Sequence, residues 1–226
     1  MAETGKLTIQ VNDSDSVTGL LYPAAKKDRA RVTIVLGHGA GADQMSGFMR
    51  MAAEGFAARG LDAMTFNFIY KEQRRGAPDP KAKLEACYRA VIETAINHKK
   101  LKGNDLVIGG KSMGGRIASQ VAAEDSAGIS GLVYLGYPLH PPGRLDKMRD
   151  EHLPKIKVPM LFVQGSRDAF GSEPEIKATI TKHRLKADLF VIESGDHSFK
   201  VPKSVKPQQQ VYEEVMDEVA RWCRAL

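Results

Sequence analysis

Short apolar runs alternate with amphipathic stretches along most of the chain. An apolar run of about four to eight residues bounded by glycine is typical of a buried strand, and apolar residues that recur every three or four positions are typical of a helix. After an opening pair, the predicted strands cover residues 31–36, 61–69, 106–108, 131–135, 159–164 and 189–192. The predicted helices cover residues 49–58, 80–100, 117–123, 174–185 and 208–224, and a polar loop is predicted for residues 70–80.

The first two predicted strands differ from the others. Residues 7–11 and 17–21 alternate between apolar and polar positions, which predicts a hairpin at an edge of the sheet with its turn at residues 12–15. Later strands and helices alternate, so we expect one α/β domain over residues 1–226, with a mostly parallel central sheet and helices on both faces. Such sheets hold their functional sites at the carboxyl ends of the strands, where the glycine-rich loops of this chain lie.

Composition narrows the class of protein. The chain has 226 residues, of which 42% are apolar and 27% charged, as in an ordinary globular domain. It has no apolar run long enough for a membrane span, and residues 1–6 lack the apolar stretch of a secretory signal. Cys87 and Cys223 are far apart in helical segments and predict free thiols in a reducing cytoplasm, without a disulfide framework or a metal-binding pattern. The net charge of +6 comes from basic residues interspersed with acids, so we expect no nucleic-acid or membrane partner.

The pattern Gly110-x-Ser112-x-Gly114 lies between a predicted strand and a predicted helix. It matches the nucleophile elbow, a tight turn that holds a serine in a strained conformation with its hydroxyl exposed. Side chains two residues before and after the serine would clash in this turn, so glycine is required at both positions. The helix that follows directs the positive end of its dipole at the place where an oxyanion would form.

Two other interpretations compete for the same residues. A glycine-rich turn with an idle serine fits the five residues equally well. A phosphate-binding loop also ends in Gly-Lys-Ser, but it needs a glycine where this chain has Asp105, and the positions that follow belong to an apolar strand. We therefore reject the nucleotide-binding interpretation.

A serine nucleophile needs a base, and the base needs an acid that orients it. Of the six histidines, His197 is predicted as the base because it alone lies in a loop between the last strand and the last helix. Asp168, directly after the strand at residues 159–164, is predicted as the acid. Asp196 is the second choice, because neighbouring side chains in an extended loop point in different directions. The two backbone donors of an oxyanion hole would be Met113 and Ala40, with Gly41 as the alternative to Ala40.

The order Ser112, Asp168, His197 is that of the α/β-hydrolase triad, and the chain resembles an α/β-hydrolase over nearly its full length. Residues 110–116, 137–143 and 194–199 are similar to a narrower family of small predicted hydrolases. That family includes bacterial proteins, a testis-expressed vertebrate protein and a subunit of a chromatin acetyltransferase complex, and it is distantly similar to dienelactone hydrolases. The resemblance implies a serine-hydrolase triad, although dienelactone hydrolases carry cysteine where this chain has Ser112. The chromatin member shows that the fold can also serve as a scaffold.

The leading hypothesis is a cytoplasmic serine hydrolase that cleaves an ester, thioester or related acyl bond in a small polar or short-chain substrate and requires no metal ion or organic cofactor. The alternative is a hydrolase-like interaction module without turnover. The segment at residues 140–157 has room for one helix at most, over residues 145–153, so we expect no cap domain, an open site and a preference for short acyl chains. The basic side chains expected at the mouth are either a solvated rim or a binding site for an anionic substrate, and they are Arg74, Arg75 and His140, together with Lys71 and Arg144.

Overall fold

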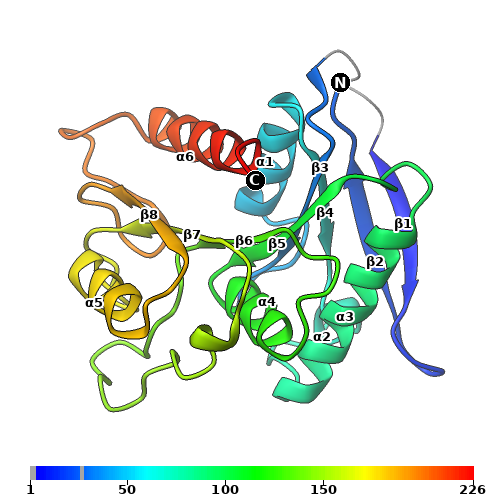
Figure 1. Cartoon of the computed structure of the whole chain (residues 1–226), viewed down its shortest axis with the longest axis horizontal. Helices are drawn as coiled ribbons and strands as arrows, with labels where there is room; N and C mark the ends of the chain where they lie inside the picture. The colour runs from blue at the N-terminus through cyan, green and yellow to red at the C-terminus, as the bar shows by residue number, and fades with distance from the viewer. Residues whose placement is uncertain (1–3, 26–27) are drawn as a thin grey trace.

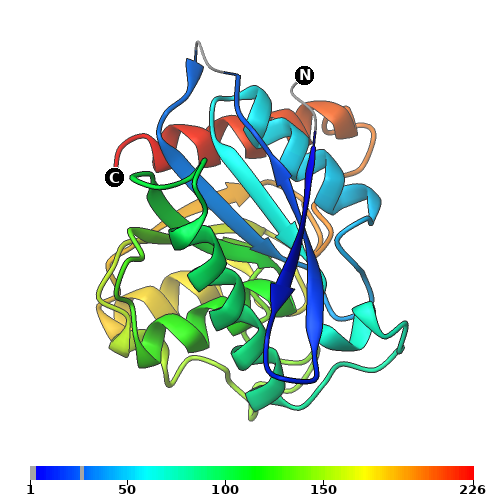
Figure 2. The ribbon, with the colours of Figure 1, turned by 90° about the vertical axis from the view of Figure 1, so that its right-hand side faces the viewer.

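A computed structural model describes residues 4–25 and 28–226, so residues 1–3 of the N-terminal segment considered above lie outside the described part. The sheet has eight strands in the order β1-β2-β4-β3-β5-β6-β7-β8 (Figure 1). Strands β1 and β2 pair antiparallel, as the alternating pattern predicts, and this hairpin is in front in Figure 2. β2 is also antiparallel to β4, and the remaining pairs are parallel. The strands are β1 (Gly5–Gln10), β2 (Ser16–Tyr22), β3 (Val32–Gly37), β4 (Asp62–Phe66), β5 (Asp105–Lys111), β6 (Gly131–Leu135), β7 (Met160–Gly165) and β8 (Ala187–Ile192).

Two layers of helices cover the sheet (Figure 1). Helices α1 (Gly47–Ala58) and α6 (Gln208–Cys223) lie on one face, and α3 (Lys81–Asn97), α4 (Met113–Glu124) and α5 (Glu173–His183) lie on the other. Central strands contribute alternate residues to two separate cores: Val35 packs with α3 and α4, whereas its neighbours Ile34 and Leu36 pack with α1 and α6. Burial on both faces explains why these strands are continuously apolar in the sequence.

The strand predicted for residues 61–69 is shorter in the structure, where β4 ends at Phe66. The N–H of Phe68 donates to Nε2 of His38 at 3.2 Å instead of to a neighbouring strand. A short helix, α2 (Ile69–Glu72), follows where a polar loop was expected. Phe68, Ile69 and Tyr70 are buried in the core, so their apolar character reflects burial outside the sheet.

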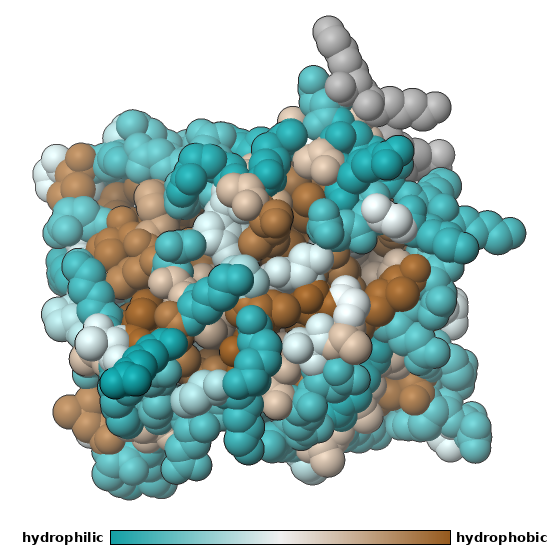
Figure 3. All heavy atoms as spheres, viewed as in Figure 1, coloured by the Kyte–Doolittle hydropathy of each residue, from teal (hydrophilic) through white to brown (hydrophobic). Residues whose placement is uncertain are grey.

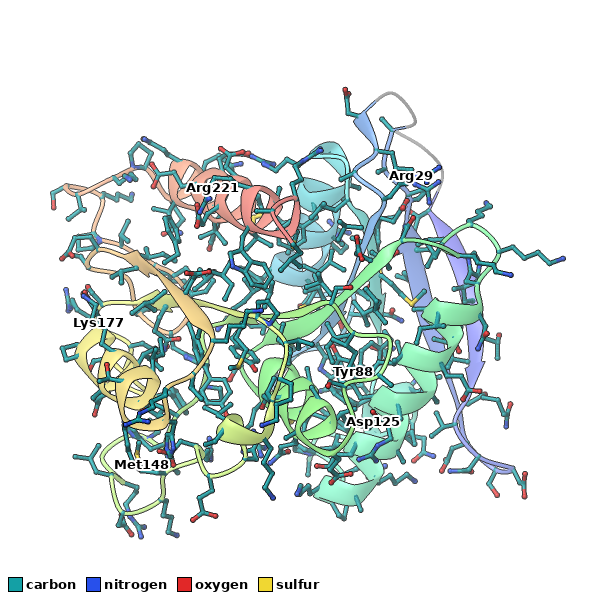
Figure 4. The ribbon with its side chains drawn as sticks, viewed as in Figure 1. Arg29, Tyr88, Asp125, Met148, Lys177 and Arg221 are labelled. Atoms are coloured by element: carbon teal, nitrogen blue, oxygen red, sulfur yellow. The ribbon has the colours of Figure 1, made fainter. Side chains whose placement is uncertain are left out.

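The segment between β6 and β7 forms no helix over residues 145–153. It contains only the 3₁₀-helix η2 (Leu153–Lys155), so the fold has no cap domain. A helix would require the Arg149 N–H to bond to residue 145, but it donates to the carbonyl of Leu139 at 2.8 Å. Figure 4 labels Met148 in this segment, at the surface of the molecule.

Tyr88 connects α3 to the two central strands (Figure 4). Its hydroxyl accepts the Gly109 N–H at 3.0 Å and lies 3.0 Å from the Val35 oxygen and 2.6 Å from the Gly109 oxygen, to either of which it can donate. The tyrosine therefore fixes β5 against β3 shortly before the chain turns at Ser112. The parallel connections run in opposite directions on either side of β3 and β5, and ligand sites form at such a switch point.

The surface mixes residue types. On the face in Figure 3, hydrophilic side chains surround hydrophobic ones that are visible near its middle. Such a mixture is ordinary, since apolar atoms contribute more than half of the accessible surface of folded proteins. Within residues 4–25 and 28–226, no helix combines the length and apolarity that crossing a bilayer would need.

Candidate active site

Ser112 occupies the turn between β5 and α4 with φ 51° and ψ −113°, the strained conformation expected of a nucleophile elbow. The carbonyl of Gly37 on β3 packs directly against this turn. A Cβ at Gly110 would lie 2.1 Å from the Gly37 oxygen, and one at Gly114 would lie 2.0 Å from it. The prediction that both positions require glycine is confirmed by these contacts.

A chain of hydrogen bonds leads from Ser112 to Asp168. Nε2 of His197 lies 2.8 Å from Oγ of Ser112, and Nδ1 of His197 lies 2.7 Å from Oδ2 of Asp168. An ionised carboxylate only accepts, so Nδ1 carries the hydrogen and Nε2 is free to accept one from the serine. The structure thus brings together the three side chains that the sequence selected, from loops after β5, β7 and β8.

Asp168 is 2% exposed, and two further donors fix its carboxylate. Nε2 of Gln164 donates to Oδ2 at 2.8 Å, and the N–H of Phe170 donates to Oδ1 at 2.8 Å. Asp196 faces its own turn, where Oδ1 accepts the N–H groups of Ser198 and Lys200 at 2.8 and 2.9 Å. This geometry supports the ranking of Asp168 over Asp196. Sequence reasoning missed Gln164, because a glutamine inside an apolar strand gives no signal of its partner.

The loop after β3 lies against the elbow, since a Cβ at Gly39 would be 3.8 Å from Cβ of Ser112. Buried His38 fixes this loop. Its Nε2 accepts the Phe68 N–H, so its Nδ1 carries the hydrogen and donates to the Gly39 oxygen at 2.8 Å. Burial lowers the pKa of His38 to about 4, so the ring is neutral near pH 7. In a trans peptide the N–H points opposite to the C=O, so holding the Gly39 oxygen also sets the direction of the Ala40 N–H.

Tyr70 holds the next peptide of the same loop. Its hydroxyl donates to the Ala40 oxygen at 2.8 Å. Ala40, Gly41 and Met113 all line the cavity in front of Ser112, so both alternatives for the first oxyanion donor remain at the site. Met113 begins α4, where the first N–H groups of a helix have no partner within the helix and can receive an anion.

Lys111 is the second residue at the site that sequence reasoning did not select. Its ammonium group donates to the backbone carbonyl of His197 and lies 5.2 Å from the ring centroid of Phe199. Burial lowers the pKa of Lys111 to about 8, against the opposing attraction of Asp168 and Asp196. The neighbour of Ser112 in the sequence therefore holds the histidine loop in place.

A cavity of about 600 Å³ opens in front of Ser112, a size that suits a small ligand. Two arginines, Arg116 and Arg149, line it, and the sequence interpretation had singled out neither. Arg116 could have been found from its place one helical turn after Ser112, whereas nothing in the sequence near Arg149 indicates its position. The other lining residues are Gly39, Ala40, Gly41, Ala42, Pro78, Asp79, Lys81, Leu84, Lys111, Met113, Pro138, Phe170, His197 and Ser198.

The basic residues expected at the mouth lie elsewhere, which corrects that part of the sequence prediction. Arg74, Arg75 and His140 do not line the cavity. Arg75 is paired with the buried carboxylate of Asp79, and Arg74 is exposed in a turn with φ 56°. His140 is 3% exposed, and its Nε2 lies 3.2 Å from Oε1 of Glu175. Within residues 4–25 and 28–226, no group of three or more His, Cys, Asp or Glu side chains could hold a metal ion.

Comparison with known proteins shows the family and the fold of the chain. A family model described as an alpha/beta hydrolase domain matches residues 30–224. An alpha-beta serine hydrolase homologue from Coxiella burnetii superposes with a TM-score of 0.76 at 19% identity, over 96% of each chain. A serine hydrolase without a lid from Xanthomonas campestris gives 0.73 at 18% identity, over 98% of this chain and 96% of the other. A dienelactone hydrolase from Anabaena variabilis gives 0.73 at 19% identity, over 97% and 96%.

Proposed function

The chain belongs to the alpha/beta hydrolase domain family, and on this basis we propose that it is a serine hydrolase that cleaves a small acyl ester or thioester. The observation that carries the proposal is the continuous hydrogen-bonded chain from Ser112 through His197 to Asp168. The strained backbone of Ser112 adds support, because strain of this kind persists where function requires it. We further propose that the chain acts in the cytoplasm and groups with the small predicted hydrolases named above.

In the first half of the proposed reaction, Oγ of Ser112 attacks the carbonyl carbon while Nε2 of His197 takes the hydroxyl proton. Asp168 stabilises the imidazolium that forms. The negative charge that develops on the substrate oxygen is stabilised by the N–H groups of Met113 and Ala40. His197 then gives its proton to the leaving oxygen or sulfur, and the acyl group remains on Ser112.

In the second half, a water molecule attacks the acyl carbon. His197 takes a proton from this water and returns it to Oγ of Ser112, which releases the acid and restores the enzyme. Every proton in this cycle moves through Nε2 of His197, so the tautomer fixed by Asp168 is needed in both halves.

The test is labelling of the folded protein with a fluorophosphonate probe, which forms a covalent bond to an activated serine. We expect labelling of the wild type near neutral pH and none of Ser112→Ala. The matched control is Ser198→Ala, which removes another serine that lines the same cavity and should leave labelling intact. Failure of the folded wild type to react would contradict the enzyme and favour an interaction module.

A further inference from the structure

Two arginines from different elements reach the cavity that contains Ser112. Arg116 lies one turn into α4, and its N–H donates to the Ser112 carbonyl at 3.1 Å. Residues four apart share a helix face, so Arg116 projects on the same side as the proposed nucleophile. Arg149 comes from the segment between β6 and β7, within the stretch 145–153 where a helix was expected.

Arg116 is not neutralised by its surroundings. Its Nε is buried and has no hydrogen-bond partner in the part of the chain that the structure describes. Burial and the positive charge of Arg149 both lower the pKa of Arg116, and Tyr137 and Glu85 only partly oppose them. Lys81, which lines the same cavity, is paired with Glu85 at 3.4 Å, whereas no described carboxylate lies within 4.0 Å of either arginine.

Two hydrogen bonds fix the backbone of Arg149 in place. Its N–H donates to the Leu139 oxygen at 2.8 Å, and its carbonyl accepts the Tyr137 hydroxyl at 2.8 Å. The guanidinium uses Nη1 to donate to the Pro138 oxygen at 3.2 Å. A guanidinium has five N–H donors, so most of those of Arg149 have no hydrogen-bond partner in the described part of the chain.

A buried, unpartnered donor beside a like charge is unfavourable for the folded protein. The unpartnered donor of Arg116 belongs to a residue that lines the cavity in front of Ser112. An anion bound between the two guanidinium groups would offset this unfavourable free energy. Arginine suits such a ligand, because its planar fork binds two oxygens of a carboxylate or phosphate at once.

We propose that Arg116 and Arg149 form a subsite for an anionic group on the substrate, a carboxylate or a phosphate carried by the acyl compound that Ser112 cleaves. The proposal rests on the proposed function and specifies its substrate class. It replaces Arg74, Arg75 and His140 as the source of charge selectivity.

The first test compares two esters that differ only in charge, p-nitrophenyl hydrogen glutarate and p-nitrophenyl methyl glutarate. We expect the wild type to prefer the charged ester in kcat/KM at low salt. Arg149→Gln and Arg116→Gln should each lower the ratio of charged to neutral ester by roughly 10- to 100-fold, the range for losing one hydrogen bond to a charged group. Arg149→Lys keeps the charge without the fork and should retain part of the preference.

The matched control is Arg144→Gln, which removes the same charge from the same segment. Arg144 is exposed and paired with Asp146 outside the cavity, so its loss should leave the ratio unchanged. Equal kcat/KM for both esters in the wild type would overturn the subsite. So would a ratio that changes equally in Arg149→Gln and Arg144→Gln.

A second test does not depend on turnover. Calorimetry on Ser112→Ala would measure binding of glutarate and of inorganic phosphate, with and without Arg149→Gln. Loss of binding in the double variant supports the subsite, and the tighter of the two anions identifies the chemistry. Anions that bind equally well without Arg149, or not at all with it, would refute the subsite. Because this measurement needs no reaction, failure of the subsite can be distinguished from failure to react with a fluorophosphonate.

Discussion

The ammonium group of Lys111 donates a hydrogen bond to the backbone carbonyl of His197. The contact joins the residue before the proposed nucleophile to the proposed base across two strands of the sheet. Its charge is held in a buried position, where the pKa of Lys111 falls to about 8. Lys111 therefore acts as a positioning residue, and it also places a positive charge next to the imidazole.

Replacing Lys111 by Met should therefore slow the reaction. Loss of the hydrogen bond should lower kcat/KM by roughly 10- to 100-fold. Lys200→Met removes an exposed lysine from the same loop and should leave kcat/KM unchanged. An unchanged kcat/KM in Lys111→Met would contradict the positioning role.

Asp168→Asn should leave the fold intact and reduce kcat by roughly 10³–10⁴-fold, because the amide no longer fixes the tautomer of His197. Asp196→Asn should reduce it far less, since Asp196 accepts hydrogen bonds only within its own turn. Steady-state kinetics on the two purified variants decides between them. A larger loss of kcat in Asp196→Asn than in Asp168→Asn would identify Asp196 as the acid.

Activity should fall as the solution is acidified through the range in which a histidine titrates, near ~6.5. The sign follows from the mechanism, because Nε2 of His197 must be unprotonated to accept the serine proton. His38 does not contribute to this limb, since burial lowers its pKa to about 4. Measured kcat/KM that stays constant across the histidine range would contradict a histidine base.

The absence of a cap domain leads to a prediction about acyl chain length. The cavity is about 600 Å³, and no helical insertion covers it between β6 and β7. We expect rates for p-nitrophenyl esters to be highest for short acyl chains and to decline as the chain grows. A steady rise in kcat/KM toward long chains would indicate a deep apolar pocket and contradict this prediction.

Two buried tyrosines should respond oppositely to loss of the hydroxyl. Tyr88→Phe removes the partner of the Gly109 N–H and should lower the free energy of unfolding by about 1–3 kcal/mol. The Tyr134 hydroxyl is buried without a partner among the described residues, so Tyr134→Phe should leave that free energy unchanged or raise it by about 1 kcal/mol. Urea denaturation monitored by circular dichroism measures both. Equal losses would mean that the two hydroxyls contribute equally to stability, which would contradict the prediction.

The local pattern predicted the features that depend on neighbouring residues. The elbow glycines at Gly110 and Gly114, the order of strands and helices, and the opening hairpin all follow from spacing and periodicity. The strand over residues 61–69 was overextended, because an apolar run does not distinguish burial in a sheet from burial beside it. Phe68 and Ile69 are core residues without being strand residues.

The features that the sequence did not predict depend on contacts that its pattern of residue types does not encode. Gln164 acts on Asp168 from within a strand, and Arg149 reaches the cavity because Leu139 and Tyr137 hold its backbone. Arg75 was selected for its charge, but a carboxylate four residues later pairs with it. Charge alone could not separate a paired arginine from an unpaired one, because the partner is fixed by the fold.

The order of the strands also has a consequence for how the protein is made. The residues up to the end of β4 build one side of the sheet, and the residues from β5 onward build the other side. Ala40 belongs to the first of these two parts, while Ser112, Asp168 and His197 belong to the second. A nascent chain that has left the ribosome only as far as β4 carries the loop of Ala40 without a nucleophile, and one that stops at β7 still lacks its base. The proposed triad is therefore complete only after the loop that follows β8 has been synthesised.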